Sequence, residues 1–130
     1  MGDANKKPQA REVACLAREL GFSPTDAQAG SLALYLDLLS SWNKRMNLVG
    51  PSKWQAIFSE LVSDSLHLAL FLEERMQGEP RCLDLGAGAG IPGIPLRILW
   101  DRGEYVLVEI REKRVVFLRY ALSRLKLPGT

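Results

Sequence analysis

The first 79 residues place apolar side chains at the spacing of amphipathic α-helices. Residues 8–20 follow this period and stop at Gly21, a residue suited to a left-handed helix C-cap, so they predict a first short helix. Residues 52–78 predict a further helical segment, because apolar side chains recur along it at the same spacing. The polar letters SDS at 63–65 interrupt that pattern and can break the segment in two.

Between these two segments lies the longest helical pattern of the chain. Ser23, Pro24 and Asp26 have the residue types of an N-cap, a first-turn proline and a capping-box acid. They precede an apolar stripe at helical spacing, formed by Leu32, Tyr35, Leu39, Trp42 and Met46. We therefore expect the second helix to begin just after Ser23 and to end near Asn47.

From residue 80 onward the apolar pattern changes from helices alone to strands alternating with helices. Two short apolar runs predict buried strands, and two amphipathic stretches predict helices. In chain order these segments are 81–86, 92–100, 104–109 and 111–126. The alternation indicates an α/β class, the first half of a doubly wound, Rossmann-like parallel fold. We divide the chain into an N-terminal helical region at 1–79 and a partial Rossmann-like domain at 80–130.

The composition is that of an ordinary globular domain, with 47% apolar residues, 25% charged residues and a net charge of +2. This small net charge does not by itself indicate a nucleic-acid partner, so any basic patch has to be local. No apolar run approaches the roughly 18 residues of a bilayer span, and the N-terminus lacks the apolar core of a secretory signal. We expect a cytoplasmic location and no membrane partner.

The two cysteines, Cys15 and Cys82, form no CxxC pair. They are predicted to be free thiols in packed positions. No metal site is predicted.

The stretch CLDLGAGAGIPGIPL at 82–96 places an acid just before a glycine-rich loop. Its letters fit both a dinucleotide loop and an S-adenosylmethionine loop. A pyrophosphate requires backbone N–H donors without a nearby anion, but Pro92 lacks an N–H and Asp84 adds a negative charge. S-Adenosylmethionine carries a cationic amino group, which Asp84 attracts, and a carboxylate, which glycine N–H groups can bind. The charge of Asp84 therefore favours S-adenosylmethionine.

A second acid completes the predicted cofactor site. Glu109 closes the second strand 25 residues after Asp84, where a carboxylate can accept hydrogen bonds from both ribose hydroxyls. A strand-to-helix turn without a ligand is the alternative, but three glycines would then lose backbone entropy without need. The residues predicted to bind the cofactor are Asp84, Gly86, Gly88, Gly90 and Glu109.

Four stretches of the chain carry a family resemblance: SSWNKRMNL (40–48), SDSL (63–66), LDLGAGAGIPGIPL (83–96) and VEIREKRVVFL (108–118). Together they resemble the glucose-inhibited division protein B family of S-adenosylmethionine-dependent methyltransferases, which act on N7 of a guanine in 16S ribosomal RNA. The resemblance covers roughly residues 20–127. It implies that Ile91 joins the loop around the methionine part of the cofactor and that small-subunit ribosomal RNA is the partner. This chain departs from the family at Glu60 and Leu61, where members often have an Arg-His pair.

The candidate RNA contacts are Asn43, Lys44, Asn47, Lys113 and Arg114. The two asparagines lie at a helix end, where they either cap the helix or, as the resemblance suggests, line a cleft for RNA or cofactor. Residues 111–126 carry six basic residues and one acid, a face that either meets RNA phosphates or is only solvated.

Catalytic residues are not assigned from the sequence. Guanine N7 has an in-plane lone pair, so methyl transfer to it requires alignment more than deprotonation. The one histidine, His67, is expected to pack or to cap within an apolar helix.

Three functions remain open. The first is an RNA methyltransferase or its N-terminal piece. The second is a non-catalytic cofactor-binding or assembly module that needs a partner or the missing C-terminal half, and the third is a nucleotide-dependent oxidoreductase. Asp84 and Pro92 oppose the third. Two strands supply only part of a cofactor site, so the 130-residue chain alone is not expected to methylate RNA.

The incomplete sheet also predicts a homo-oligomer. Leu83, Val106 and Val108 would be exposed on it, and soluble monomers avoid such an apolar patch.

Overall fold

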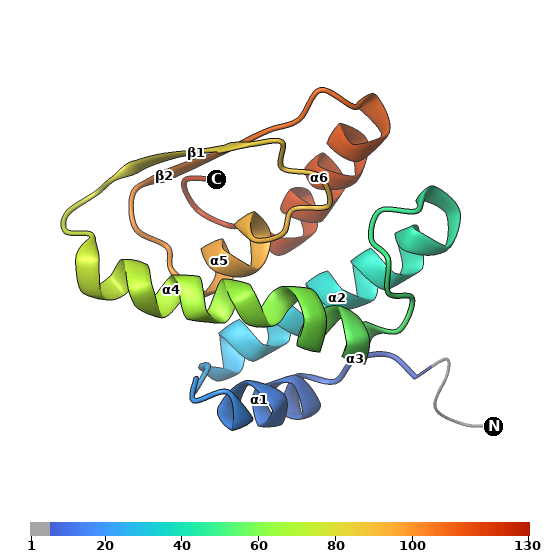
Figure 1. Cartoon of the computed structure of the whole chain (residues 1–130), viewed down its shortest axis with the longest axis horizontal. Helices are drawn as coiled ribbons and strands as arrows, with labels where there is room; N and C mark the ends of the chain where they lie inside the picture. The colour runs from blue at the N-terminus through green and yellow to red at the C-terminus, as the bar shows by residue number, and fades with distance from the viewer. Residues whose placement is uncertain (1–5) are drawn as a thin grey trace.

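Figure 1 shows the computed structural model of the chain, which describes residues 6–130. Helices make up the first part, and strands alternate with helices in the second. In chain order the elements are α1 (Ala10–Glu19), α2 (Asp26–Met46), α3 (Trp54–Ile57), the π-helix η1 (Phe58–Val62), α4 (Ser63–Arg75), β1 (Arg81–Leu85), α5 (Gly93–Leu99), β2 (Glu104–Val108) and α6 (Glu112–Leu125). This order confirms the predicted α/β class.

Helix α2 is the longest element and contacts α1, α3, α5 and α6. It is capped by Thr25, whose hydroxyl accepts from the Gln28 N–H while the Gln28 side chain accepts from the Thr25 N–H. The prediction of Ser23 as the N-cap is therefore wrong, because this reciprocal pair satisfies two N–H groups that the helix start leaves free. The predicted end is confirmed, since Asn47 is a left-handed C-cap with φ 49°.

Residues 54–75 form a continuous helix that includes one π-helical segment. The break considered at 63–65 does not occur, because these residues open α4. The irregularity lies one turn earlier, in η1. Phe58, Val62 and Leu66, which recur every four residues, are all buried. This spacing lies on one face of an ordinary α-helix as well, so the apolar pattern does not reveal the π-turns.

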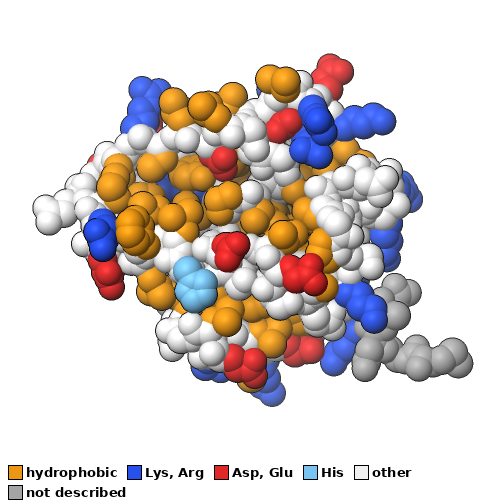
Figure 2. Space-filling model, viewed as in Figure 1, with side chains coloured by type: hydrophobic (Ala, Val, Ile, Leu, Met, Phe, Trp, Pro, Cys, Tyr) orange, Lys and Arg blue, Asp and Glu red, His pale blue; other side chains and the backbone are white. Residues whose placement is uncertain are grey.

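Strands β1 and β2 pair in parallel, with Asp84 opposite Leu107, and form a two-stranded sheet in the described part of the chain. Side chains alternate between its two faces. One face is covered by helices, with α4 and α5 below the strands in Figure 1. The other face exposes Leu83, Leu85, Val106 and Val108, of which Leu85 is 76% exposed. Apolar side chains reach the surface over the strands at the top of Figure 2, as the sequence predicted for this face.

One apolar core joins the N-terminal helices to the strands and helices that follow. It contains Val13 of α1, Leu36 of α2, Ile94 of α5 and Phe117 of α6. A smaller cluster packs α4 against α5 and β2 through Ala69, Leu96, Trp100 and Tyr105. The division at residue 80 stays a prediction, and the side chains on its two sides share this core.

Two predictions of packed side chains are wrong. Cys15 is exposed on α1, because Val13 and Ala17 turn toward the core and Cys15 lies between them on the outer side. His67 is exposed on α4, and Figure 2 shows it at the surface in pale blue. Cys82 is half-buried, and both cysteines are free, as predicted.

A buried arginine holds together the end of α5, the start of β2 and the segment 126–130. Arg97 is 1% exposed. Its guanidinium donates to the carbonyls of Trp100, Arg102, Gly103 and Pro128 and to the hydroxyl of Thr130. Burial lowers the pKa of Arg97, since the charge is removed from water. Oriented carbonyl dipoles therefore replace water around this cation.

The same corner requires a glycine at position 103. Gly103 has a φ of +62°, and a Cβ added to it would overlap the Pro80 carbonyl oxygen. Its carbonyl accepts from Arg97 at 2.9 Å, and its N–H donates to the Glu79 carboxylate at 2.7 Å. Gly103 thus lets the chain pass close to the segment that leads into β1.

Candidate functional site

The loop between β1 and α5 contains three glycines in the left-handed conformation. Gly86, Gly88 and Gly90 have φ angles of +78°, +59° and +89°. A Cβ added to Gly90 would lie 2.7 Å from Ile94 Cδ1 and 3.1 Å from Leu118 Cδ2, whereas one added to Gly86 would meet nothing within 4 Å. The loop therefore packs on the core at Gly90 and borders open space at Gly86.

The backbone of this loop is bonded to the end of β2. The Gly86 N–H donates to the Val108 carbonyl at 2.9 Å, and the Gly88 N–H donates to the Glu109 carboxylate at 2.9 Å. The other Glu109 oxygen accepts from the Arg111 N–H at 3.2 Å. These two backbone hydrogen bonds, first that from Gly88, lower the pKa of Glu109. An ionised carboxylate thus lies against the glycine loop.

The Asp84 carboxylate lies at the end of β1, on the helix-covered face of the sheet. The Tyr105 hydroxyl donates to its Oδ2 atom at 3.1 Å. A Cβ added to Gly93 at the start of α5 would lie 2.7 Å from the same oxygen. The pKa of Tyr105 is raised, first by burial and then by the charge and hydrogen bond of Asp84. Asp84 is therefore held in place between β2 and α5.

Tyr35 connects the N-terminal helices to the loop. It lies on α2, is fully buried, and donates from its hydroxyl to the Ala89 carbonyl at 2.7 Å. Burial raises the pKa of Tyr35 well above its ordinary value. Tyr35 and Tyr105 belong to apolar patterns in the sequence, and these patterns predict no role for their hydroxyls. Their roles could have been anticipated from the general rule that a tyrosine hydroxyl needs a hydrogen-bond partner when it is buried.

The structure brings the residues predicted to bind the cofactor to one edge of the sheet. Asp84 precedes the loop, the three loop glycines follow, and Glu109 is bonded to Gly88. Ile91 is half-buried and packs on the core. The open space beside Gly86, with a carboxylate at the end of each strand, fits a ligand that carries both a cationic group and hydroxyl groups. S-Adenosylmethionine has both.

Asn43 makes the local hydrogen bonds that the sequence left as one of two alternatives. Its amide donates to the Pro51 carbonyl at 3.0 Å, and its Oδ1 accepts from the Val49 N–H at 2.9 Å. Asn43 is 8% exposed. Its side chain therefore fixes the turn that follows α2.

Three of the other candidate RNA contacts come together in a hollow of about 440 Å³ beside the glycine loop. The hollow is lined by Asn47 at the end of α2 and by Lys113 and Arg114 at the start of α6. A Cβ added to Gly88 would lie 3.5 Å from Arg114 Nη1, so one side chain of the hollow borders the loop. Lys44 lies outside it, on the exposed side of α2.

Residues 6–130 contain no group of three or more histidine, cysteine or acidic side chains placed to hold a metal ion. None of the described helices combines the length and the apolar character needed to cross a membrane.

Comparison with known proteins assigns this arrangement to a family. Residues 28–130 match the GidB family, described as rRNA small subunit methyltransferase G. The chain is 54% identical over 121 residues to "Ribosomal RNA small subunit methyltransferase G" of Nitratidesulfovibrio vulgaris, covering 92% of this chain and 56% of that protein. The proteins of the same name from Lawsonia intracellularis and Escherichia coli O1:K1 are 49% and 36% identical, over 92% and 89% of this chain and 56% and 54% of theirs. The chain thus spans about half the length of these curated relatives.

Proposed function

Since this chain belongs to the rRNA small subunit methyltransferase G family, we propose that it binds S-adenosylmethionine at its glycine loop and takes part in methyl transfer to ribosomal RNA. One observation carries this proposal: Asp84 lies near the end of β1, Glu109 follows its parallel neighbour β2, and both adjoin a loop of three left-handed glycines. In open α/β sheets, ligands bind at the carboxyl ends of the strands.

The residues of this site divide between the groups of the cofactor. Asp84 is assigned the cationic amino group, the glycine loop with Ile91 the rest of the methionine part, and Glu109 the ribose hydroxyls. Tyr105 positions Asp84, and Tyr35 positions the loop through Ala89. The bound cofactor supplies an electrophilic methyl group on its sulfonium.

The proposed methyl acceptor is N7 of a guanine in 16S ribosomal RNA. Its in-plane lone pair attacks without losing a proton first, so the chain has to align the base more than to provide a general base. The hollow with Asn47, Lys113 and Arg114 supports an RNA substrate, because cationic side chains beside the loop can bind phosphates next to the target base.

Titration calorimetry tests the choice of cofactor. We expect S-adenosylmethionine, or its demethylated product, to bind more tightly than NAD, because Asp84 repels a pyrophosphate and attracts an ammonium group. Asp84→Asn should weaken S-adenosylmethionine binding by about 1–3 kcal/mol, or about 5- to 150-fold in Kd. Asp101→Asn, at an exposed acid beyond the far end of α5, is the matched control and should leave the Kd unchanged. Tighter binding of NAD would contradict the assignment.

A non-catalytic cofactor-binding or assembly module is the second candidate function. The two-stranded sheet favours it, because two strands provide only the methionine and ribose sides of a cofactor site. Incubating the chain with small ribosomal subunits and labelled S-adenosylmethionine separates the two candidates. We expect cofactor binding without transfer, which supports the module. Methyl transfer by the chain alone would support the enzyme and contradict the expectation that two strands are too few.

Self-association is a further proposal, supported by the apolar face of the sheet. The chain should form a dimer or higher oligomer, through the sheet edges or by exchange of the C-terminal helix, because soluble monomers rarely leave such a patch exposed. Light scattering after size exclusion at micromolar concentration measures this. Leu85→Lys should yield monomers, whereas Leu20→Lys, at an exposed leucine after α1, should not. A compact monomer of the unchanged chain would be the opposite result.

A further inference from the structure

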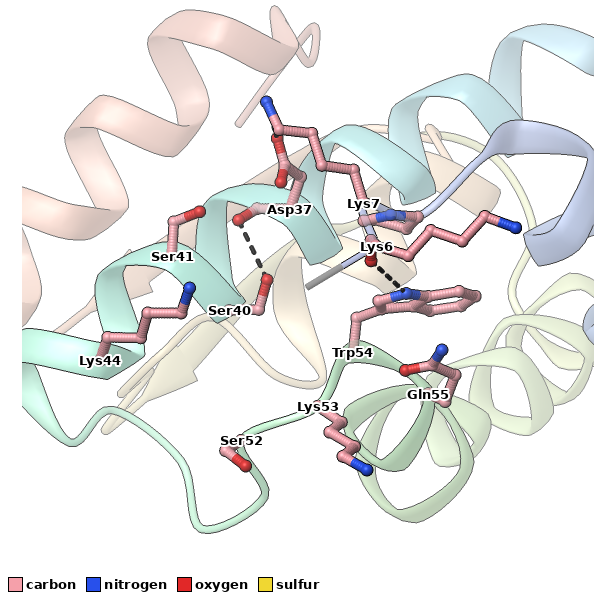
Figure 3. A pocket seen from close by; sticks show the side chains of 11 residues that line it. Lys6, Lys7, Asp37, Ser40, Ser41, Lys44, Ser52, Lys53, Trp54 and Gln55 are labelled. Carbon is pink, nitrogen blue, oxygen red and sulfur yellow. Dashed lines mark hydrogen bonds and ion pairs between the residues drawn. The ribbon is translucent and has the colours of Figure 1, made fainter. Parts of the chain in front are cut away.

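A polar pocket of about 260 Å³ lies on the side of helix α2 that faces the N-terminal segment. The charged residues that line this pocket, the lysine pocket, are Lys6, Lys7, Asp37, Lys44 and Lys53. Figure 3 shows Asp37, Ser40, Ser41 and Lys44 along α2, opposite Trp54 and Gln55 at the start of α3. Tyr35, which bonds the glycine loop, extends from the same helix into the core, so the lysine pocket is separate from the cofactor site.

The walls of the lysine pocket are fixed by hydrogen bonds, and two of its lysines have no acidic partner. The Trp54 indole N–H donates to the Lys6 carbonyl at 3.1 Å, and this ring is only 5% exposed. Lys7 lies 3.9 Å from the Asp37 carboxylate. None of the ion pairs in residues 6–130 involves Lys44 or Lys53. The pocket therefore offers unneutralised ammonium groups without an exposed ring on which a base could stack.

The lysine pocket adjoins a second hollow, and the second adjoins a third whose Arg114 borders the glycine loop. Ser41 and Lys44 also line a second hollow, together with Trp42, Arg45 and Met46. Met46 in turn lines the hollow of Asn47, Lys113 and Arg114 beside Gly88. We call these three adjoining hollows the basic track. The track runs around the C-terminal part of α2, from the lysine pocket to the loop.

Basic residues are concentrated in this track and depleted elsewhere. The chain has 17 basic and 15 acidic residues, and the track is lined by eight of the former and two of the latter. The rest of the chain then has nine basic residues against thirteen acidic ones. On a surface where charged residues serve only solubility, positive and negative side chains are mixed. This separation instead attracts a polyanion to one path across the surface.

We propose that the basic track binds the phosphate backbone of an RNA strand, with the lysine pocket as a phosphate site away from the glycine loop. The proposal rests on the function proposed above, which places an RNA base at the loop. Lysines bind phosphates as point charges and read no sequence, so the track contributes affinity and orientation and does not select the base. Each phosphate contact makes binding weaker as salt increases.

The salt dependence of RNA binding tests the track. Fluorescence anisotropy of a labelled single-stranded RNA oligonucleotide gives the slope of log K against log salt concentration. The double variant Lys44→Gln/Lys53→Gln should reduce that slope by about 1.4, since each single-strand phosphate contact contributes about 0.7. Arg18→Gln is the control, because Arg18 is an exposed basic residue at the end of α1, outside both the track and the basic face of residues 111–126, and its variant should keep the wild-type slope.

The outcomes separate this proposal from the proposed function. Calorimetry should show unchanged S-adenosylmethionine binding in the double variant, because neither lysine lies at the loop. RNA binding with an unaltered slope in the double variant would overturn the track and leave the proposed function standing. Binding of inorganic phosphate that is lost in the double variant, together with an unaltered RNA slope, would assign the lysine pocket to a lone anion and overturn the RNA assignment. No RNA binding by the wild-type chain would overturn both proposals.

Discussion

Arg97→Ala is expected to lower the free energy of unfolding by about 3–5 kcal/mol, a large part of the stability of a small domain. The substitution leaves the carbonyls of Trp100, Gly103 and Pro128 without their donor at a site where water has little access. Each unsatisfied buried acceptor costs about 1–3 kcal/mol, and the lost side chain also leaves a cavity. Urea denaturation followed by circular dichroism measures the effect.

Arg81→Ala is the matched control for this measurement. The Arg81 side chain is 75% exposed, and its ion pair with Glu104 at 3.1 Å is also at the surface. Exposed pairs contribute about 0–1 kcal/mol, so this variant should remain close to the wild-type chain. Equal losses in Arg97→Ala and Arg81→Ala would mean that the carbonyls around Arg97 find other partners.

Gly103→Ala is expected to destabilise the chain by about 3 kcal/mol or more, the second large effect. The φ of +62° is unfavourable for alanine, and the new Cβ would overlap the Pro80 carbonyl oxygen, which is backbone and cannot rotate away. Thermal unfolding measures the loss. Gly30→Ala is the control within α2, where an added Cβ meets nothing within 4 Å and helix propensity should increase stability by up to about 1 kcal/mol. Similar losses of stability in Gly103→Ala and Gly30→Ala would contradict the conclusion that the backbone at position 103 requires glycine.

The elements of this fold were predictable because each has a clear apolar period. The switch from helical to strand-like spacing near residue 80 indicated both strands and their parallel pairing, which the structure confirms. The start of α2 was misplaced, because Gln28 forms a capping box with Thr25 and this competed with the Ser23-Pro24 pattern. The π-helix was missed, since its side-chain spacing differs from that of an α-helix by only a fraction of a residue per turn.

The candidate site was predictable where the chain itself supplies the pattern. An acid, three glycines and a second acid are close in sequence, and the parallel strands place them at one edge. Contacts between distant segments were not predictable. Tyr35 and Ala89 are 54 residues apart, and four of the five partners of Arg97 are backbone carbonyls, which carry no sequence signature. The lysine pocket likewise forms only when Lys6 is brought beside α2.

The hydrogen bond between Tyr35 and Ala89 also affects the entropy of ligand binding. Ala87 and Ala89 are 2% and 7% exposed and belong to the core, so packing already immobilises the loop backbone. A flexible loop loses about 1–2 kcal/mol of conformational freedom per residue when a ligand orders it. This loop has lost that freedom during folding, so contacts with a ligand contribute to affinity without an ordering penalty. A ligand bound there consequently stabilises every helix that shares the core, and not the loop alone.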